Sequence, residues 1–521
     1  MHVNILYGSV TFLHRCILIK STAPLPLAFL VALLSLVAAL SARAQNANEL
    51  PDIGSPANSV LTQGEEYQVG AMVVRNLRAE GKIVEDPEVN EYVQSLGSRI
   101  ASQASGDSGQ RFQFFVVRDD SINAFALPGG FIGVNSGLVL TTHNEAQLAS
   151  VLAHESAHVT QRHIARSVKA QGRQSIASAA AILAAILLGA TTGASADAVQ
   201  GAIAISQGAA LQSQINFTRA NEYEADRVGM SFLAAAGFDP NSMADLFDSM
   251  GRRNGLAAQG VPEFLQTHPV SSNRIAEARA RAAQLHVSVQ PESASYALMR
   301  ERLRVIGGES GADVRPYYEM RSKAQPLTPA ERYGQALANL RSGDKDTAAT
   351  EFTELAAQFP QVPAIQAALG QSQLAAGDRR SAMATFESAL AVSPRNVPLT
   401  VRYAEALMKT GNPKAAHTLL LDLFNNVPPT PDQIRLTALA ASAAGDTGDA
   451  YYYMSEYHIA GGDLTLSAQQ LELALAAPNL TQVQRRRFQA RLDEVREAMS
   501  RDRRHGKRAD DSGSRGLHVE H

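Results

Sequence analysis

Cysteine is almost absent from this sequence of 521 residues: the only one is Cys16, in an N-terminal segment that we expect to be removed. The remaining chain therefore cannot form a disulfide, use a thiol as nucleophile or hold a metal through thiolates. Any metal bound by the mature protein must be held by His, Asp and Glu side chains.

A strong excess of charge of either sign is also lacking. The formal net charge is -3, and 19% of the residues are charged. This balance gives no indication of nucleic-acid binding, which normally requires a basic surface. With 45% hydrophobic residues, the chain is long enough for two or more globular domains.

Residues 1–44 have the pattern of a secretory signal peptide. Arg15 and Lys20 precede the apolar run LAFLVALLSLVAAL, which ends in the small-x-small triplet Ala42-Arg43-Ala44. We predict cleavage after Ala44 and export of the mature chain. The alternative is an uncleaved anchor, which is less favoured because the apolar core is short for a membrane span.

The segment that follows predicts a mixed domain over residues 45–325. Residues 61–104 contain two helical patterns, and Phe112–Val117 and Asn123–Val139 are strand-like, with Pro128-Gly129-Gly130 as the turn of a hairpin. A further helix is expected from Asn144, which is a suitable N-cap residue.

The most apolar stretch of the mature chain is residues 175–194. We predict a helical hairpin over about 175–212, either buried or grazing a membrane. A single span would place the segments before and after it on opposite faces of a bilayer. Those segments contain His154, His158 and Glu222, which are proposed below to bind one metal ion. A double span is less favoured because the second arm is short and weakly apolar.

Residues 326–500 contain a repeat of 34 residues, in which four columns keep one register. The columns are a small residue (336, 370, 404, 438), a glycine (343, 377, 411, 445), an alanine (348, 382, 416, 450) and a proline (360, 394, 428). The period and these positions resemble tetratricopeptide repeats, which are stacked helix pairs. The polar tail, residues 501–521, is predicted to be disordered.

The motif His154-Glu155-Ser156-Ala157-His158 lies in an otherwise apolar helix. Residues four apart face the same side of a helix, so both imidazoles can bind one ion while Glu155 flanks it. A third ligand is needed, because a catalytic zinc keeps three protein ligands and one open position. Glu222 is the candidate, with Asp226 one turn later as the partner of a ligand histidine. The alternatives are hydrogen-bonded core histidines and a solvated acidic face.

The order of motifs from Asn123 to Leu138, then HESAH, EYEAD and THP, resembles the zinc peptidase family that includes the HtpX and CAAX prenyl proteases. The signal peptide and C-terminal repeats resemble the periplasmic branch of that family. The resemblance implies that His154, His158 and Glu222 bind one zinc ion, that Glu155 is the general base, and that the mature protein is periplasmic. It also implies a disulfide, for which the mature chain has no cysteine.

The expected fold is mostly α: a helical zincin-type metallopeptidase domain with a small β-hairpin or sheet, followed by an α-solenoid of tetratricopeptide repeats.

His268 is a candidate fourth ligand that blocks water in a resting state; a structural or substrate-contacting role is the alternative. Arg274 is a candidate for stabilising the transition state. His163 is expected off the ligand face, either as an outer partner of the ligands or on the surface. An extended substrate is expected to pair with an edge strand formed by Phe131, Ile132, Gly133, Val134 and Asn135.

Three functions are compatible with these patterns. The first is a periplasmic zinc endopeptidase that cleaves misfolded or stalled envelope proteins, with the repeats recruiting polypeptide substrates or the outer-membrane assembly machinery. The second is a chaperone or assembly scaffold with a largely silent metal site. The third is a membrane-embedded processing peptidase. The basic C-terminal run permits a peripheral membrane contact, although a solvated helix face is the simpler interpretation.

Overall fold

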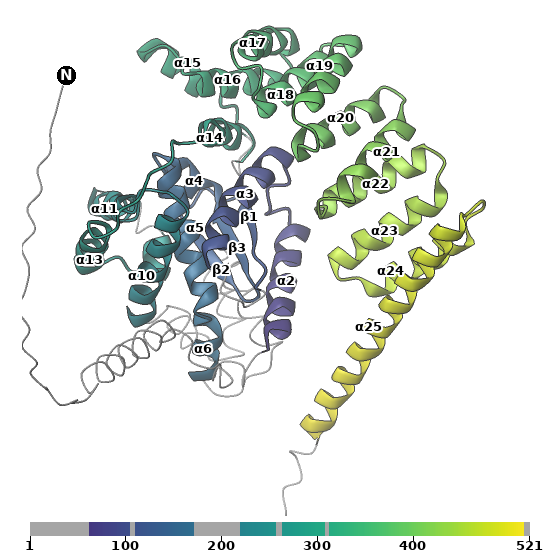
Figure 1. Ribbon diagram of the computed structural model, residues 1–521, viewed down its shortest axis with the longest axis horizontal. Helices are drawn as coiled ribbons and strands as arrows, with labels where there is room; N and C mark the ends of the chain where they lie inside the picture. The colour runs from purple at the N-terminus through teal and green to yellow at the C-terminus, as the bar shows by residue number, and fades with distance from the viewer. Residues whose placement is uncertain (1–61, 105–109, 171–218, 257–262, 308–311, 515–521) are drawn as a thin grey trace, which may run out of the picture. The chain divides into compact units, whose positions relative to one another are not determined.

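The computed structural model describes residues 62–104, 110–170, 219–256, 263–307 and 312–514 (Figure 1). The predicted signal peptide (1–44) and the whole of the predicted apolar hairpin (175–212) lie outside these residues. By its internal contacts the chain divides into Met1–Ser55 and Pro56–His521, and all described residues belong to the second unit. Among the helices of the described residues, none is both long and apolar enough to cross a bilayer.

The first part of the described chain is a helical domain around one small sheet, as the sequence predicts. Its elements are α2 (Gln63–Ala79), α3 (Pro87–Ala104), β1 (Gln113–Val117), β2 (Ala124–Leu127), β3 (Phe131–Asn135), α4 (Ser136–Thr141), α5 (Glu145–Thr160), α6 (His163–Ala170), α10 (Arg219–Ala235), α11 (Asn241–Leu256), α12 (Glu263–Thr267), α13 (Ser272–Ala282), α14 (Ala294–Ile306) and α15 (Arg315–Ala324).

The second part consists of paired helices. Their bounds are α16 (Pro329–Ser342), α17 (Lys345–Gln358), α18 (Pro363–Ala375), α19 (Arg379–Val392), α20 (Val397–Lys409), α21 (Pro413–Phe424), α22 (Pro431–Ala443), α23 (Thr447–Gly461), α24 (Leu464–Ala476) and α25 (Gln482–Ser514).

The sheet confirms the predicted hairpin but corrects the predicted edge strand. β2 and β3 pair antiparallel around a turn in which Gly129 and Gly130 have φ of 81° and 92°, which glycine adopts without strain. However, the strand order is β1-β3-β2, so Phe131–Asn135 is the central strand and is buried throughout. The prediction of a free edge there is wrong, because β1 pairs with β3 in parallel. The strand also ends earlier than expected, since α4 begins at Ser136.

Helix α5 carries the HESAH motif through the centre of this domain. The side chain of Asn144 accepts a hydrogen bond from the Gln147 backbone N–H, which confirms the predicted N-cap. Nearly every residue from Glu145 to Val159 is buried, so the helix is surrounded on all faces. Helix α10 packs closely on it at Gly229, where a Cβ atom would lie 2.9 Å from the carbonyl oxygen of Ala153.

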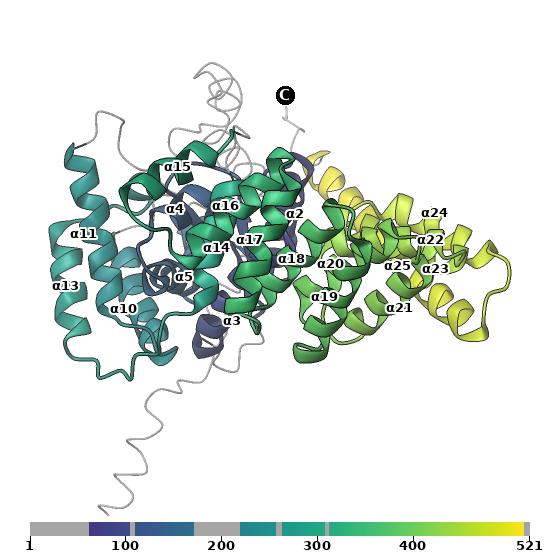
Figure 2. The ribbon, with the colours of Figure 1, turned by 90° about the horizontal axis from the view of Figure 1, so that it is seen from above.

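The repeat columns have direct structural roles. The glycines at 343, 377, 411 and 445 all have positive φ and end the first helix of each pair. Asp344, Asp378 and Asp446 then cap the next helix through their side chains. The small residues Ala336 and Ala404 are fully buried where helices meet. Consecutive helices from α16 to α24 pack on one another (Figure 2), which is the arrangement of a tetratricopeptide solenoid.

The last two helices of the described residues are α24 and α25, and α25 continues to Ser514. The predicted disorder of residues 501–521 is therefore wrong for 501–514, while 515–521 lie outside the described residues. Arg501 pairs with Glu497 one turn earlier, the spacing at which opposite charges stabilise a helix.

A buried group of charges joins the repeats to the helical domain. Arg402 of α20 lies 2.8 Å from Asp86 Oδ2 and 2.7 Å from Glu88 Oε2, at the start of α3. Arg302 of α14 binds the same two carboxylates, at 2.7 Å from Asp86 and 2.9 Å from Glu88. Burial raises the pKa of Asp86, but the two guanidinium groups outweigh it and hold this pKa well below its usual range. We call this buried group of Arg402, Arg302, Asp86 and Glu88 the Arg402 joint. Because α3 packs on α5, the Arg402 joint connects the repeats to the helix that carries HESAH.

We predict that Arg402→Met lowers the free energy of unfolding by about 3–5 kcal/mol, the usual cost of removing one partner from a buried ion pair. The reason is that the Glu88 carboxylate, 1% exposed, keeps only Arg302 as a charged partner. Urea titrations followed by circular dichroism measure the effect. Arg435→Met is the control, since Arg435 and Asp432 are about half exposed and their pair is worth about 1 kcal/mol or less. Equal losses for both variants would contradict the prediction.

Candidate metal centre

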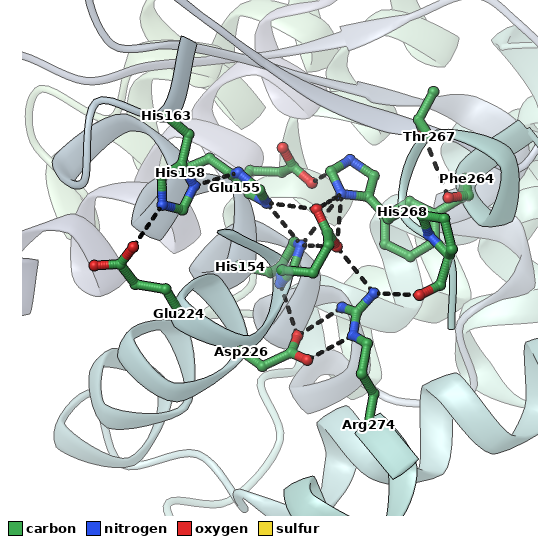
Figure 3. Close-up of polar contacts among 12 residues, drawn as sticks. His154, Glu155, His158, His163, Glu224, Asp226, Phe264, Thr267, His268 and Arg274 are labelled. Atoms are coloured by element: carbon green, nitrogen blue, oxygen red, sulfur yellow. Dashed lines mark hydrogen bonds and ion pairs between the residues drawn. The ribbon is translucent and has the colours of Figure 1, made fainter. Parts of the chain in front are cut away.

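Two helices bring the three predicted ligands together, and Figure 3 shows His154 and His158 among the polar contacts of the site. His154 and His158 lie one turn apart on α5, and their Nε2 atoms are 3.0 Å apart. Glu222, in the first turn of α10, places Oε2 at 3.6 Å from His154 Nε2 and Oε1 at 3.5 Å from His158 Nε2. All three side chains are buried. The convergence that the spacing predicts is thus present.

His268 completes a group of four. It follows α12, and its Nδ1 lies 3.4 Å from His154 Nε2 and 3.1 Å from Glu222 Oε1. Its Nε2 lies 3.6 Å from Glu155 Oε1, so the ring stands between the ligand atoms and the motif glutamate. One ligand atom from each of His154, His158, Glu222 and His268 lies within 4.8 Å of all the others.

The spacing of these atoms fits a tetrahedral zinc ion. Zn–N and Zn–O bonds of about 2.0–2.1 Å in a tetrahedron place neighbouring ligand atoms about 3.3 Å apart. The separations from His154 Nε2 to His158, His268 and Glu222, and from Glu222 Oε1 to His158 and His268, are 3.0 to 3.6 Å, close to this value. Core histidines in an ordinary hydrogen-bonded network would not need four such atoms to face one point.

The charges also fit a divalent cation. Three buried carboxylates, Glu155, Glu222 and Asp226, are accompanied by one guanidinium, that of Arg274. Burial lowers the pKa of His154, but Asp226 and Glu222 outweigh it and raise this pKa to about 10. The same excess of negative charge that would hold a proton on His154 would hold a metal cation. Burial and the neighbouring His154 lower the pKa of His158 well below its usual value, which suits a neutral ligand.

Glu155 lies beside the ligand group and has few polar partners. Its carboxylate is fully buried, and the polar groups near it are His268 Nε2, at 3.6 Å from Oε1, and the backbone of Ala126. Burial is the main cause that raises its pKa above the usual range of a carboxyl. A fully buried carboxylate with so few polar partners is costly and indicates a role in proton transfer or beside a bound ligand.

Asp226 and Arg274 form a support beneath the ligands. Asp226 Oδ1 lies 3.1 Å from His154 Nδ1, the position predicted for the partner of a ligand histidine. Arg274 donates to both oxygens of Asp226 at 2.7 and 2.8 Å and lies 2.9 Å from Glu222 Oε2. It also donates to the Pro269 carbonyl oxygen, directly after His268. These contacts indicate that Arg274 holds Asp226, Glu222 and the segment after His268 in position. They favour this role over the transition-state role suggested by the sequence.

Two residues beyond the predicted ligands lie next to the site: His163, for which the sequence predicts an outer position or a surface position, and Glu224, which is not assigned from the sequence. His163 is fully buried, with Nδ1 at 2.8 Å from Nδ1 of His158. Its Nε2 lies 3.2 Å from Oε2 of Glu224, which belongs to the EYEAD motif. The signal that could have indicated them is the presence of a histidine just after HESAH and of a second acidic residue within EYEAD.

Comparison with known proteins agrees with this geometry. Residues 87–282 match Peptidase family M48, and residues 373–443 match a tetratricopeptide repeat. Beta-barrel assembly-enhancing proteases of Yersinia pestis and Escherichia coli are each 31% identical, over 88% and 91% of this chain and over 94% and 96% of their own lengths. A similarly named Vibrio cholerae relative is 40% identical over 60% of this chain, and the match spans 64% of its own length.

Proposed function

We propose that this chain, which belongs to the beta-barrel assembly-enhancing protease family of M48 metallopeptidases, is a periplasmic zinc endopeptidase that cleaves misfolded or stalled outer-membrane proteins. The observation that carries the proposal is the group formed by His154, His158, Glu222 and the adjacent Glu155. The name of the relatives, beta-barrel assembly-enhancing protease, supports the substrate class, and the signal-like N-terminus supports the location.

In this proposal His154, His158 and Glu222 hold the zinc ion. Bound there, zinc would lower the pKa of a water molecule and polarise the scissile carbonyl group. Glu155 accepts the proton of the attacking water and delivers it to the nitrogen of the leaving amine. Its raised pKa suits this exchange, because a carboxyl that both takes and releases a proton works best when its pKa approaches the working pH.

Asp226 and Arg274 keep the ligands in place. Asp226 places Oδ1 at 3.1 Å from His154 Nδ1, and a carboxylate there favours the tautomer with its proton on Nδ1, which leaves Nε2 free for the metal. Arg274 fastens Asp226 and Glu222 together and neutralises part of their charge. Because His154 belongs to α5 and Asp226 to α10, their contact also holds these two helices together at the site.

The substrate strand is assigned to β2 in place of β3. Among the strands of the described residues, β2 and β1 are the outer ones, and β1 is partly covered by a bridge between Ile83 and Val117. β2 also packs against α5, the helix of the ligands. A polypeptide added to β2 would bind mainly through backbone hydrogen bonds, which suits a protease of many sequences.

The repeats are assigned to protein recognition. Stacked tetratricopeptide helices present a long surface to partners, and the Arg402 joint fixes that surface to α3. Polypeptide substrates and the outer-membrane assembly machinery are the proposed partners. Casein digestion by the purified protein, with and without a metal chelator, tests the peptidase assignment: cleavage that the chelator stops is expected, and no cleavage or chelator-resistant cleavage would contradict it.

His268 is proposed to close the site in a resting state. Its Nδ1 occupies the fourth corner of the ligand group, where the attacking water would otherwise lie. The Arg274 contact with the Pro269 carbonyl holds the segment in this position. Substrate would therefore have to displace His268 before the water and Glu155 could act.

We predict that His268→Ala raises basal casein cleavage by about tenfold or more, as expected if the open state makes up about 10% or less of the wild-type population. Initial rates at equal zinc occupancy measure this effect. His286→Ala is the control, because His286 is exposed and follows α13. Unchanged activity of His268→Ala would end the switch hypothesis, and a loss of activity would assign His268 to substrate contact instead.

A further inference from the structure

His163 reaches the ligand group through an unusual turn. Five residues after His158, it would face another side if α5 continued. Instead α5 ends at Thr160, and Arg162 adopts the left-handed conformation with φ of 51° before α6 begins at His163. The turn brings the His163 ring against His158, with the two Nδ1 atoms 2.8 Å apart (Figure 3).

A distant segment maintains this turn. A left-handed conformation is unfavourable for a non-glycine residue, because the Cβ atom comes too close to the following carbonyl oxygen. The side chain of Arg162 is bound by Glu66 of α2, whose Oε1 lies 3.0 Å from Nη2 and 3.2 Å from Nε. Glu66 is itself buried. Glu66 of α2 thus stabilises the strained conformation of Arg162, which lies between α5 and α6. Strain that is maintained in this way indicates a functional role for the position of the next residue, His163.

The two nitrogens of His158 face different partners. Nε2 belongs to the ligand group, at 3.0 Å from His154 Nε2, whereas Nδ1 faces His163. A neutral imidazole that binds metal through Nε2 carries its proton on Nδ1 and donates it to an acceptor. The acceptor for His154 is a carboxylate, that of Asp226. For His158 the acceptor is the Nδ1 atom of His163.

His163 can accept this hydrogen bond only if its own proton is on Nε2. That atom lies 3.2 Å from Glu224 Oε2, which is the acceptor that such a proton needs. Arg166 lies 2.6 Å from the same oxygen and keeps the carboxylate in place. His163 is fully buried while Glu224 is 26% exposed, so the chain of contacts runs from the ligand group toward the surface.

We propose that His163 and Glu224 act together as a positioning pair that holds the His158 imidazole in the tautomer and orientation required to bind the metal. The order of contacts is His158, His163, Glu224, with one proton donated at each step. This inference rests on the proposed function, because it assumes that His158 is a metal ligand. It assigns a role to the middle acidic residue of EYEAD, between Glu222 and Asp226.

The test is the zinc dissociation constant, measured by competition with a chelating dye. His163→Phe keeps a buried ring and removes the acceptor, so it should weaken zinc binding about 10- to 100-fold, the range for a lost outer partner of a ligand histidine. Glu224→Leu should weaken it in the same direction. His163→Asn, whose Oδ1 can accept from His158, should recover most of the loss. His143→Phe, at an exposed histidine just before α5, is the control and should bind zinc like the wild type.

Thermal unfolding of the same variants without metal separates positioning from packing. The proposal expects similar unfolding midpoints for His163→Phe and His163→Asn but different zinc affinities. Equal losses of zinc affinity in both, together with equal losses of stability, would assign His163 to packing and overturn it. Wild-type affinity in His163→Phe would also overturn it, and wild-type affinity in Glu224→Leu would remove Glu224 from the pair. If the wild type itself binds no zinc, the proposed function fails first.

Discussion

Glu155→Gln should reduce casein cleavage by about 10²–10⁴-fold, the usual contribution of a general acid–base group, while zinc remains bound at wild-type stoichiometry. The amide has nearly the same shape as the carboxylate but cannot accept the proton of the attacking water. Because the ligand atoms of His154, His158 and Glu222 do not depend on Glu155, the metal group should persist. Cleavage rates and metal content, measured on the same preparation, test both parts.

Glu277→Gln is the matched control for this change. Glu277 lies on α13 in an exposed pair with Arg281, so its loss should leave cleavage unchanged. Substantial cleavage by Glu155→Gln would refute the role assigned to Glu155. Growth phenotypes of the same variant in cells separate the peptidase from the chaperone alternative, because Glu155→Gln leaves the repeat surface intact. A function that survives the substitution would favour the chaperone.

Glu222→Gln should lose both the metal and the activity. The amide oxygen is a poorer ligand than a carboxylate oxygen, and the substitution removes one of the three negative charges that the site places around the cation. We therefore expect zinc affinity to fall by more than the roughly 10–100-fold typical of outer partners. Dye competition measures the affinity, and casein cleavage should fall in proportion to the zinc that is lost.

Arg227→Gln, an exposed position on the same helix, controls for general effects on α10. Its zinc affinity should equal that of the wild type. If Glu222→Gln instead kept wild-type zinc binding, Glu222 would not be a ligand, and the carboxylate at 3.6 Å from His154 Nε2 would be a second partner of the histidines.

The features that could be predicted from the sequence are those that depend on local periodicity. His154 and His158 are four residues apart on one helix, so the sequence alone places their rings together. The four repeat columns have the same origin, since Gly343 and its equivalents must begin each turn and Asp344 and its equivalents cap the next helix. Glu222 needed the additional expectation that a third ligand exists, which the motif supplied.

The features that could not be predicted depend on contacts between distant segments. The central position of Phe131–Asn135 follows from the pairing of β1 with β3, and nothing in the β2–β3 hairpin indicates it. The joint formed by Arg402 with Asp86 and Glu88 connects residues more than 300 positions apart. Helical periodicity places His163 on a different face from His158. It could not predict their contact, because the left-handed turn at Arg162 changes the direction of the chain.

The most direct test of the metal centre is elemental analysis of the purified wild-type protein by mass spectrometry. The group formed by His154, His158, Glu222 and His268 predicts about one zinc ion per chain, removed by chelator together with casein cleavage and restored with it when zinc is added back. Protein that is folded but contains no stoichiometric metal, and that takes up none when zinc is supplied, would contradict the account.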